Sequence, residues 1–326
     1  MRPMAKSMLE VNDLIVRFRR NGATVYAVNG LSFQIGHRER LAIVGESGCG
    51  KTVTCLSILG LNSSAEVQGS IVFDGKNTLQ LPEAEMRSLR GRRIAMVFQD
   101  PSSALNPVTT IGKQMTEVIR HHHAVSSHEA RRRAISALRD MSVPSPETKL
   151  DEYPHQQSGG TNQRIMLAMA LTCDPDLLIA DEPTASLDAT VQQQIIRLLI
   201  CICEDRGMSI LCVTHNLALV RRIADRVLVL YHGMLMEEGP VDEVLHQPRH
   251  PYTKALLSAF RLESSNGVVI EGEPPSPLHL TPGCPYSARC QERIGEVCDR
   301  QMPCIIRGDG QVRCHLFDGA IVGNGV

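Results

Sequence analysis

The stretch "RLAIVGESGCGKT", residues 40–52, decides the fold. Residues 40–44 form a short apolar run, which predicts a buried strand, and residues 45–52 fit the pattern G-x-x-x-x-G-K-[ST]. Residues 51–60, "KTVTCLSILG", predict a helix that ends at Gly60. Glycine allows the backbone N–H groups of such a turn to point inward onto phosphate oxygens, and a helix N-terminus adds favourable partial charge. This order predicts a phosphate-binding α/β domain.

All eight residues of the turn are candidate nucleotide contacts. Lys51 is expected to reach the β- and γ-phosphates, and Thr52 is expected to bind Mg²⁺. A glycine-rich turn without a ligand is the alternative, which the flanking strand and helix disfavour. The candidate contacts are Gly45, Glu46, Ser47, Gly48, Cys49, Gly50, Lys51 and Thr52.

A second apolar run, "DLLIADEP" at residues 176–183, ends in two carboxylates. Behind a phosphate-binding turn, Asp181 is expected to hold Mg²⁺ directly or through water. Glu182 is expected to orient or deprotonate the attacking water. The alternative is a strand end with two solvated acids.

The remaining pattern alternates strands with helices. Residues 9–18 and 25–35 predict an antiparallel pair around an Asn-Gly turn, and Ser126 with Glu129 predicts a capping box before a helix. Alternating elements favour a mostly parallel sheet covered on both faces. Further strands are expected at 69–75, 92–98, 176–183, 208–215 and 225–233, and further helices at 111–123, 126–141 and 190–207, the last ending at Gly207.

Charge and hydropathy exclude several classes of protein. The 326 residues include 34 basic and 35 acidic side chains, so no overall field would recruit nucleic acid or anionic lipid. No apolar run reaches the ~18 residues of a membrane-spanning helix. The first residues, "MRPMAKSMLEVND", lack the apolar stretch of a secretory signal. We therefore expect a reducing compartment.

Five of the eleven cysteines crowd into residues 284–314, after a Pro-, Gly- and Ser-rich linker at 263–283. In a reducing compartment such a cluster favours metal over disulfides. The spacing C-x₅-C-x₇-C-x₁₅-C is too long for the short knuckles of structural zinc sites. A 4Fe–4S cluster, zinc and thiols without metal all remain open. The four candidates are Cys284, Cys290, Cys298 and Cys314, with Cys304 left over.

The stretch "QQSGGTNQR", residues 156–164, provides a second glycine-rich helix start. One triphosphate needs only one cradle per subunit, so a second is useful if it faces the nucleotide of another subunit. Here the chain resembles the ATP-binding cassette (ABC) ATPases, whose signature is L-S-G-G-Q. In that family two cassettes pack head to tail, which implies that Ser158, Gly159 and Gly160 contact the partner's ATP.

The resemblance spans about residues 8–258 and implies further roles. Gln99 would sense the γ-phosphate and help hold Mg²⁺, and His215 would hold the γ-phosphate. An aromatic residue would stack on adenine, with Phe18 as the best match and Tyr26 as its rival. The family's loop across the dimer interface corresponds to Ser186, Leu187 and Asp188.

The chain departs from the family pattern at a few positions near these motifs. Gln157 stands where the signature has leucine, and Thr161 and Asn162 follow the glycines. Asn216 replaces the acid that often follows the histidine. We expect Gln157 to affect packing more than chemistry.

Three stretches, residues 96–112, 250–259 and 283–314, resemble the oligopeptide and dipeptide importer ATPases. The resemblance implies a P-loop NTPase core with a mostly parallel sheet, an N-terminal antiparallel β-subdomain, a helical signature subdomain at about 100–165 and a small Cys-rich C-terminal extension. The cassette would span 1–258 and the extension 259–326.

That resemblance also implies an ATPase that drives peptide import, with ATP and Mg²⁺ as cofactors. Its partners would be a second homologous ATPase in a heterodimer, two permease subunits and, indirectly, a periplasmic peptide-binding protein, without nucleic acid. It would sit peripherally on the cytoplasmic face of the inner membrane. Nickel and glutathione importers share the pattern, so the cargo stays open. A soluble ABC ATPase outside transport and a small-molecule P-loop kinase are the alternatives from other classes.

Overall fold

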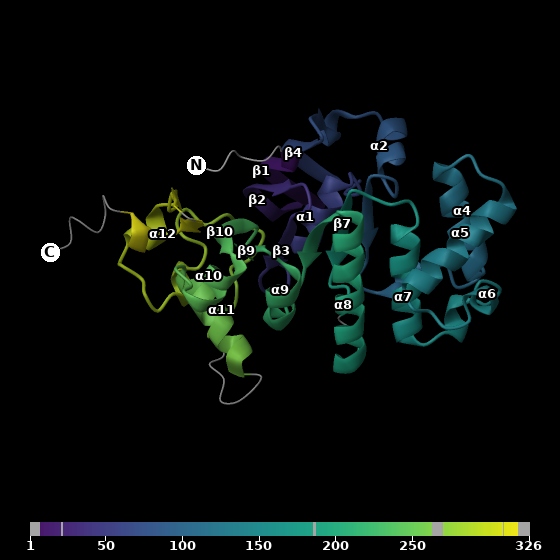
Figure 1. The fold of residues 1–326 in the computed structure, drawn as a ribbon. Coiled ribbons are helices and arrows are strands. Elements are labelled where there is room, and N and C mark those ends of the chain that lie inside the picture. The colour runs from purple at the N-terminus through teal and green to yellow at the C-terminus, as the bar shows by residue number, and fades with distance from the viewer. Residues whose placement is uncertain (1–6, 21, 185–186, 263–269, 309, 319–326) are drawn as a thin grey trace. The chain divides into compact units, whose positions relative to one another are not determined.

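The computed structural model describes residues 7–20, 22–184, 187–262, 270–308 and 310–318 (Figure 1). Its residues form two compact units. The first comprises Met1–Gln80 with Val213–Val326, and the second comprises Leu81–Cys212. The expected loop residue Ser186 lies outside the described residues, as does Asn21 of the expected turn.

The first unit begins with an antiparallel sheet of order β2-β1-β4-β5. Its long strands β1 (Ser7–Arg20) and β2 (Ala23–Gly36) pair with Phe18 opposite Val25 and Arg17 opposite Tyr26. Strands β4 (Ala65–Phe73) and β5 (Lys76–Asn77) follow, and then the short helix η1 (Thr78–Gln80). The predicted antiparallel pair is confirmed.

The same unit contains the strand that leads into the phosphate-binding turn. Strand β3 (Arg40–Val44) is followed by α1 (Lys51–Ile58), and it pairs in parallel with β9 (Arg226–Tyr231). Strand β10 (Met234–Pro240) returns antiparallel to β9 through a turn at His232 and Gly233, both with positive φ. The helices α9 (Leu217–Ile223), α10 (Val241–His246) and α11 (Pro251–Leu262) complete this part.

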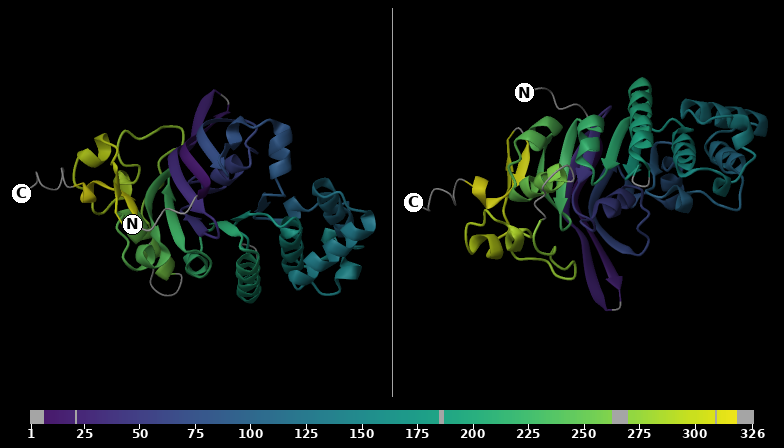
Figure 2. Two further views of the ribbon diagram at one scale, coloured as in Figure 1. Left: turned by 45° about the horizontal axis from the view of Figure 1, so that its top comes forward. Right: turned by 90° about the horizontal axis from the view of Figure 1, so that it is seen from below.

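The cysteine-rich tail folds onto these elements. It forms η3 (Ser287–Arg289), α12 (Val297–Arg300), β11 (Ile305–Arg307), β12 (Gln311–Arg313) and η4 (His315–Phe317). Strand β12 pairs antiparallel with β10, so the tail extends the sheet (Figure 2). The rings of Tyr231, Tyr252 and Tyr286 lie 4.6–5.4 Å apart in one buried cluster. The tail therefore packs its apolar side chains against the core of the first unit.

The second unit places strands β8 (Ser209–Val213), β7 (Leu177–Asp181) and β6 (Ile94–Val97) in this order, with β6 and β7 parallel. Its helices are α2 (Glu83–Leu89), α3 (Pro101–Ala104), α4 (Ile111–His122), α5 (Ser127–Asp140), α6 (Pro146–Lys149), η2 (Pro154–Gln156), α7 (Gly159–Leu171) and α8 (Ala189–Arg206). Gly207 ends α8 with φ 63°, as predicted.

The predicted capping box of α5 is half correct. Ser126 Oγ accepts the backbone N–H of Glu129 over 3.2 Å, so the cap itself is confirmed. The Glu129 carboxylate instead accepts hydrogen bonds from Arg132 and Arg133, at 2.8 and 2.9 Å. These charged donors lie one turn further along the helix and compete with the neutral N–H of Ser126.

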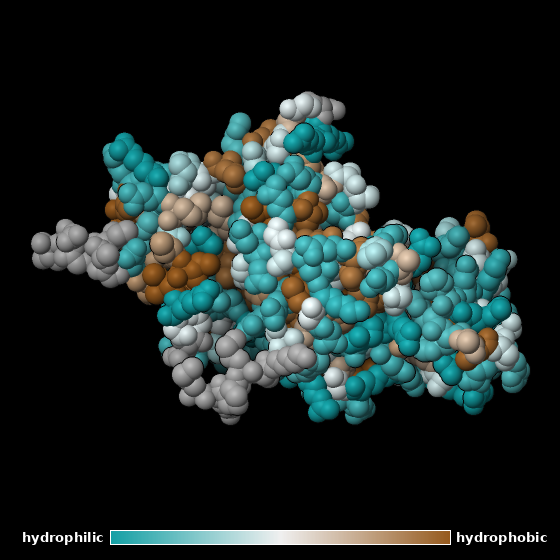
Figure 3. All heavy atoms as spheres, turned by 90° about the horizontal axis from the view of Figure 1, so that it is seen from above, coloured by the Kyte–Doolittle hydropathy of each residue, from teal (hydrophilic) through white to brown (hydrophobic). Residues whose placement is uncertain are grey.

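Among the described residues, no helix combines the length and apolar character that crossing a membrane requires. On the face in Figure 3, hydrophobic residues (brown) lie in separate areas among hydrophilic ones (teal). Among the residues that the structure describes, the most exposed large hydrophobic side chain is that of Val108, which is 81% exposed.

Candidate nucleotide site

The turn between β3 and α1 requires glycine at two positions for steric reasons. A Cβ on Gly45 would lie 2.2 Å from the carbonyl oxygen of Leu230, and one on Gly50 would lie 2.4 Å from that of Ala27. Both glycines also have positive φ, as does Gly48, which has open space around it. The turn is therefore held against strands β9 and β2 in a conformation that other residues rarely adopt.

Lys51 lies across this turn. Its side chain is only 7% exposed, and Nζ donates hydrogen bonds to the carbonyl oxygens of Gly45 and Glu46, at 2.8 and 2.9 Å. Gly50 precedes α1 and has no side chain that could cap the helix, whereas Thr52 is exposed in its first turn. A buried ammonium group beside an uncapped helix start is suited to bind phosphate.

The turn also contacts residues far away in the sequence. The backbone N–H of Glu46 donates to Tyr252 Oη over 2.9 Å, and its carboxylate accepts two hydrogen bonds from Arg289, at 2.8 and 3.1 Å. Burial raises the pKa of the Cys49 thiol, which keeps that side chain neutral inside the turn. Tyr252 and Arg289 were missed as site residues, although both lie in the stretches that resemble peptide importers.

In the second unit, three predicted site residues lie together. Asp181 ends the fully buried strand β7 and is 4% exposed. Glu182 follows with φ 46°, and its Oε2 accepts a hydrogen bond of 2.9 Å from Gln99 Nε2. Burial, followed by the charges of Asp181 and Glu182, raises the pKa of Cys212 on β8 to about 12. The carboxylates thus sit at the end of a buried strand beside an amide that binds one of them.

The second glycine-rich stretch forms the start of α7. Ser158 is the N-cap, and its Oγ accepts the N–H of Thr161 over 3.2 Å. Thr161 Oγ1 lies 2.9 Å from the same hydroxyl, and Asn162 Nδ2 donates to Pro154 O over 2.9 Å. Ser158 and Gly159 are exposed. Thr161 and Asn162, which depart from the family pattern, therefore form hydrogen bonds to neighbouring residues at the start of α7.

Gln157 makes a local contact as well, because its side-chain amide donates a hydrogen bond to the Glu152 carboxylate. A Cβ on Gly160 would meet Val191 of α8 at 3.2 Å, so this glycine allows α7 and α8 to approach. Packing and local hydrogen bonds therefore account for Gln157 and Gly160 at these positions, independently of any ligand.

Asp188 and Asn216 both cap helices. Asp188 Oδ1 accepts the N–H groups of Thr190 and Val191, both at 3.0 Å, at the start of α8. Asn216 Oδ1 accepts the N–H of Leu219 over 3.2 Å at the start of α9. Asparagine thus replaces an acid in its capping role, and the preceding His215 is exposed.

The two candidate adenine-stacking residues lie on neighbouring strands of the first unit. Both are half-buried, and the guanidinium of Arg17 lies 5.4 Å from the centre of the Tyr26 ring. Phe18 lies at the next register position. The choice between Phe18 and Tyr26 stays a prediction, as does the assembly of a complete site from the residues of both units.

Four cysteines of the tail line one small cavity of about 20 Å³: Cys284, Cys290, Cys298 and Cys314. Burial raises the pKa of Cys284 to about 12 and that of Cys314 to about 11. His250 and His315 also line the cavity, and each has one buried ring nitrogen without a hydrogen-bond partner. Cys304 is exposed and does not line this cavity.

No three His, Cys, Asp or Glu side chains of the described chain are arranged to hold a single metal ion. A four-iron cluster needs a different arrangement, because each thiolate binds a different iron. Four thiols around one cavity match that donor set in number and type.

Comparison with known proteins identifies the family. Residues 28–185 match the family model described as ABC transporter, and residues 236–298 match the oligopeptide/dipeptide transporter C-terminal region. The dipeptide transport ATP-binding protein DppD of Bacillus subtilis is 45% identical over 96% of both chains. The oligopeptide transport ATP-binding protein OppD of Salmonella typhimurium is 42% identical over 95% of this chain and 93% of its own.

Solved structures give the same result. The dimeric ATP-binding cassette MJ0796, bound to ADP and Pi in a post-hydrolysis state, matches with a TM-score of 0.66 and 26% identity, over 72% of this chain and 99% of its own. CbiO1 of Clostridium perfringens, part of the transporter complex cbiONQ, matches with a TM-score of 0.62 and 26% identity, over 79% of this chain and 96% of its own. The chain therefore belongs to the ABC transporter ATP-binding proteins, in the group with the oligopeptide/dipeptide transporter C-terminal region.

Proposed function

We propose that this chain hydrolyses ATP and couples that reaction to the import of peptides by membrane permease subunits. The observation that carries the ATPase proposal is the position of Lys51, whose buried ammonium lies across a glycine turn at an uncapped helix start. The family membership and the similarity to a cassette bound to ADP and Pi support the same activity.

The reaction assigns a role to each predicted residue. Lys51 and the backbone N–H groups of residues 45–50 bind the phosphates, and Glu182 orients or deprotonates the attacking water. The hydrogen bond from Gln99 fixes the direction of the Glu182 carboxylate before water is positioned. His215 contacts the γ-phosphate, and Phe18 stacks on adenine.

Mg²⁺ would neutralise charge on the β- and γ-phosphates when it is bound. Thr52, Asp181 and Gln99 would hold it. Hydroxyl, carboxylate and amide oxygens are the hard donors that Mg²⁺ prefers, so these residues fit the ion.

Each hydrolytic site is completed by a second cassette. Ser158, Gly159 and Gly160 supply an exposed helix start that contacts the partner's ATP, and Asp188 lies in the loop that crosses the interface. A homologous but different ATPase is the expected partner, so that the complex holds two cassettes, two permease subunits and a periplasmic peptide-binding protein. The cassettes lie on the cytoplasmic face of the membrane.

The cargo proposal depends on the C-terminal part of the chain. The relatives named above are dipeptide and oligopeptide transport proteins, and their similarity extends over the C-terminal region. Nickel and glutathione are the alternative cargoes of the same ATPase role.

The permease docks on the second unit beside α4. A groove of about 390 Å³ is lined there by residues of α4 together with Asn106, Thr109 and Met169. Val108 projects from the neighbouring loop with 81% of its surface exposed.

Cys284, Cys290, Cys298 and Cys314 would hold a 4Fe–4S cluster with a structural or redox-sensing role, and the cavity of about 20 Å³ between them would have to widen to admit it. The number of thiols and their common cavity support this proposal. Zinc, and packed thiols without metal, remain its alternatives.

Co-purification of the chain with its permeases, followed by identification of the bound cargo and measurement of ATP hydrolysis, tests the function. We expect the permeases to stimulate hydrolysis and peptides to be released on denaturation. Stimulation by DNA or ribosomes, and none by permeases, would place the chain outside transport.

A further inference from the structure

One ion pair among the described residues joins the C-terminal tail to the phosphate-binding turn. Arg289 Nη1 and Nη2 donate to the two carboxylate oxygens of Glu46, at 2.8 and 3.1 Å. The side chain of Arg289 is 6% exposed and that of Glu46 is 21% exposed. We infer that Arg289 neutralises Glu46 within the turn and is thereby a positioning residue for the nucleotide. The inference rests on the proposed ATP binding at this turn.

The charge of Glu46 needs such a partner. The turn is built to attract phosphate anions, with N–H groups, a helix start and Lys51, yet it contains a carboxylate. An unpaired carboxylate at this place would repel a triphosphate and weaken the attraction of Lys51. The guanidinium group of Arg289 neutralises the charge of the Glu46 carboxylate, and both side chains are largely shielded from solvent.

Arg289 is held so that it cannot easily turn away. Besides Glu46, its guanidinium donates hydrogen bonds to Tyr231 Oη at 3.0 Å and to the carbonyl oxygens of Glu271 at 3.0 Å and Ile270 at 3.3 Å. The same group lies 5.8 Å from the ring centre of Tyr231 and 6.0 Å from that of Tyr286. Desolvation lowers the pKa of Arg289, but the hydrogen bonds to Glu46 and Tyr231 together outweigh it and leave the pKa raised.

A second contact fixes the backbone of the same residue. The N–H of Glu46 donates to Tyr252 Oη over 2.9 Å, and Tyr252 is fully buried in the tyrosine cluster. Side chain and backbone of Glu46 are thus both bound by residues that lie more than two hundred positions along the chain.

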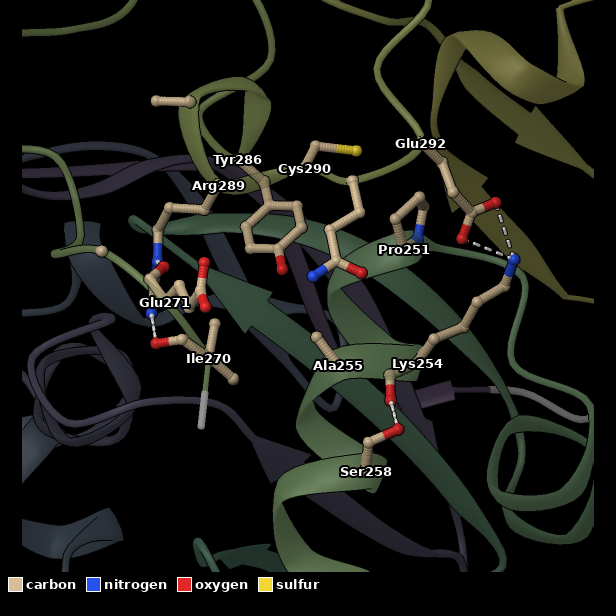
Figure 4. A pocket seen from close by; sticks show the side chains of 13 residues that line it. Pro251, Lys254, Ala255, Ser258, Ile270, Glu271, Tyr286, Arg289, Cys290 and Glu292 are labelled. Atoms are coloured by element: carbon tan, nitrogen blue, oxygen red, sulfur yellow. Dashed lines mark hydrogen bonds and ion pairs between the residues drawn. The ribbon is translucent and has the colours of Figure 1, made fainter. Parts of the chain in front are cut away.

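Arg289 also lies in the segment that contains Cys290, one of the four thiols of the proposed cluster. Figure 4 shows Arg289, Tyr286 and Cys290 along the wall of a pocket of about 600 Å³ that α11 closes on the other side. Cys290 lines this pocket and the four-cysteine cavity as well. The residue that binds the turn is therefore next in sequence to a thiol of the proposed cluster.

The same module provides a matched control. Lys254 Nζ pairs with Glu292 over 2.9 Å, and both side chains are about two-fifths exposed, at 43% and 42%. This ion pair joins α11 to the tail, as Figure 4 shows, but it does not include the phosphate-binding turn. Loss of Lys254 tests for general effects of a lost ion pair in this module.

The experiment measures the dissociation constant of ATP for the full-length isolated chain. The variants are Arg289→Gln, Glu46→Gln, the two together, Arg289→Lys and Lys254→Gln, at about 50 and about 500 mM salt. We expect Arg289→Gln to weaken binding about tenfold at low salt, which is within the usual range of coupling between sites. Added salt should shrink this defect, because it screens the exposed charge of Glu46.

The double variant, Arg289→Gln with Glu46→Gln, distinguishes an effect through the charge of Glu46 from a purely structural effect. If Arg289 acts through the charge of Glu46, removal of that charge should restore affinity to within about twofold of Glu46→Gln alone. Arg289→Lys should lie between wild type and Arg289→Gln, because lysine keeps the charge but cannot bind both oxygens in a fork. Lys254→Gln should bind as wild type does.

Two results would overturn the inference. One is wild-type affinity in Arg289→Gln. The other is a double variant as weak as Arg289→Gln with no dependence on salt, which would leave Arg289 a purely structural residue. If Arg289→Gln does not fold, as thermal unfolding would show, Arg289→Lys with and without Glu46→Gln provides the same comparison. A wild-type chain without ATP affinity would instead refute the proposed function itself.

Discussion

The side chain of Gln99 donates a hydrogen bond of 2.9 Å to the carboxylate of Glu182, and 83 residues separate the two in sequence. Gln99 follows β6 and Glu182 follows β7, and these strands are parallel neighbours. The ends of two buried strands therefore bring an amide and a carboxylate together. Glu182 has φ 46°, a strained conformation for a residue that is not glycine.

The first prediction concerns Gln99. Gln99→Ala removes the donor that orients Glu182, so we expect the turnover number of the assembled transporter to fall about tenfold while ATP affinity stays within about twofold. Single-turnover hydrolysis and ATP titration separate the two effects. Ser103→Ala, in the same region, is the control. Equal loss of affinity and turnover would show that Gln99 acts mainly through the binding of Mg²⁺ and nucleotide, and not through the orientation of Glu182.

The second prediction concerns the shared site. Ser158 lies exposed at the start of α7, so Ser158→Arg in this chain should impair hydrolysis at the P-loop of the partner. Lys51→Ala should impair hydrolysis at its own P-loop. Complexes with one variant in one subunit, assayed by labelling of each site with a photoreactive ATP analogue, distinguish the two. Loss of ATP binding by the isolated Ser158→Arg monomer would contradict a role toward the partner.

The third prediction concerns thiol reactivity. The attacking species is the thiolate, and burial raises the pKa of Cys212 to about 12. At a pH near 8, where Cys212 remains protonated, iodoacetamide should label the exposed Cys201 and Cys304 rapidly and Cys212 only after denaturation. Peptide mass mapping over time measures the rates. Rapid labelling of Cys212 in the folded chain would mean that β8 opens readily.

The fourth prediction concerns the four-cysteine cavity. Purification without oxygen should give a brown protein with broad absorption near ~400 nm, as iron–sulfur clusters give. Iron and acid-labile sulfide should follow the protein, and Cys290→Ser should remove both, whereas Cys304→Ser, outside the cavity, should retain them. Colourless, metal-free wild-type protein with an intact fold would leave these thiols as packing residues.

Local signals predicted much of the fold. The apolar run at 40–44 became β3, and Gly207 ended α8 with positive φ, because each depends on residues within a few positions. Strand β10 was missed, since "MLMEEGP" contains two acidic residues and does not resemble a buried strand. Both acids are nevertheless buried.

Their burial depends on partners in neighbouring elements, 12 or 13 positions away in the sequence. Glu237 accepts the N–H groups of Arg249 and His250, at 2.8 and 2.9 Å, and Glu238 pairs with Arg226. The contacts of Glu46 with Tyr252 and Arg289 could not be predicted either, because these residues approach Glu46 only in the folded chain. Motif spacing predicted candidate site residues, which stay predictions, but it could not predict the distant side chains that contact them.

The most direct test of the account is hydrolysis by Glu182→Gln in the complete complex. General-base contributions are typically ~10²–10⁴-fold, so turnover should fall by that factor while ATP affinity is retained. The two cassettes should then remain as an ATP-bound dimer, which size-exclusion chromatography with nucleotide analysis detects, whereas Lys51→Ala should prevent its formation. Near-normal hydrolysis by Glu182→Gln would contradict the proposed mechanism and transfer the catalytic role to another residue.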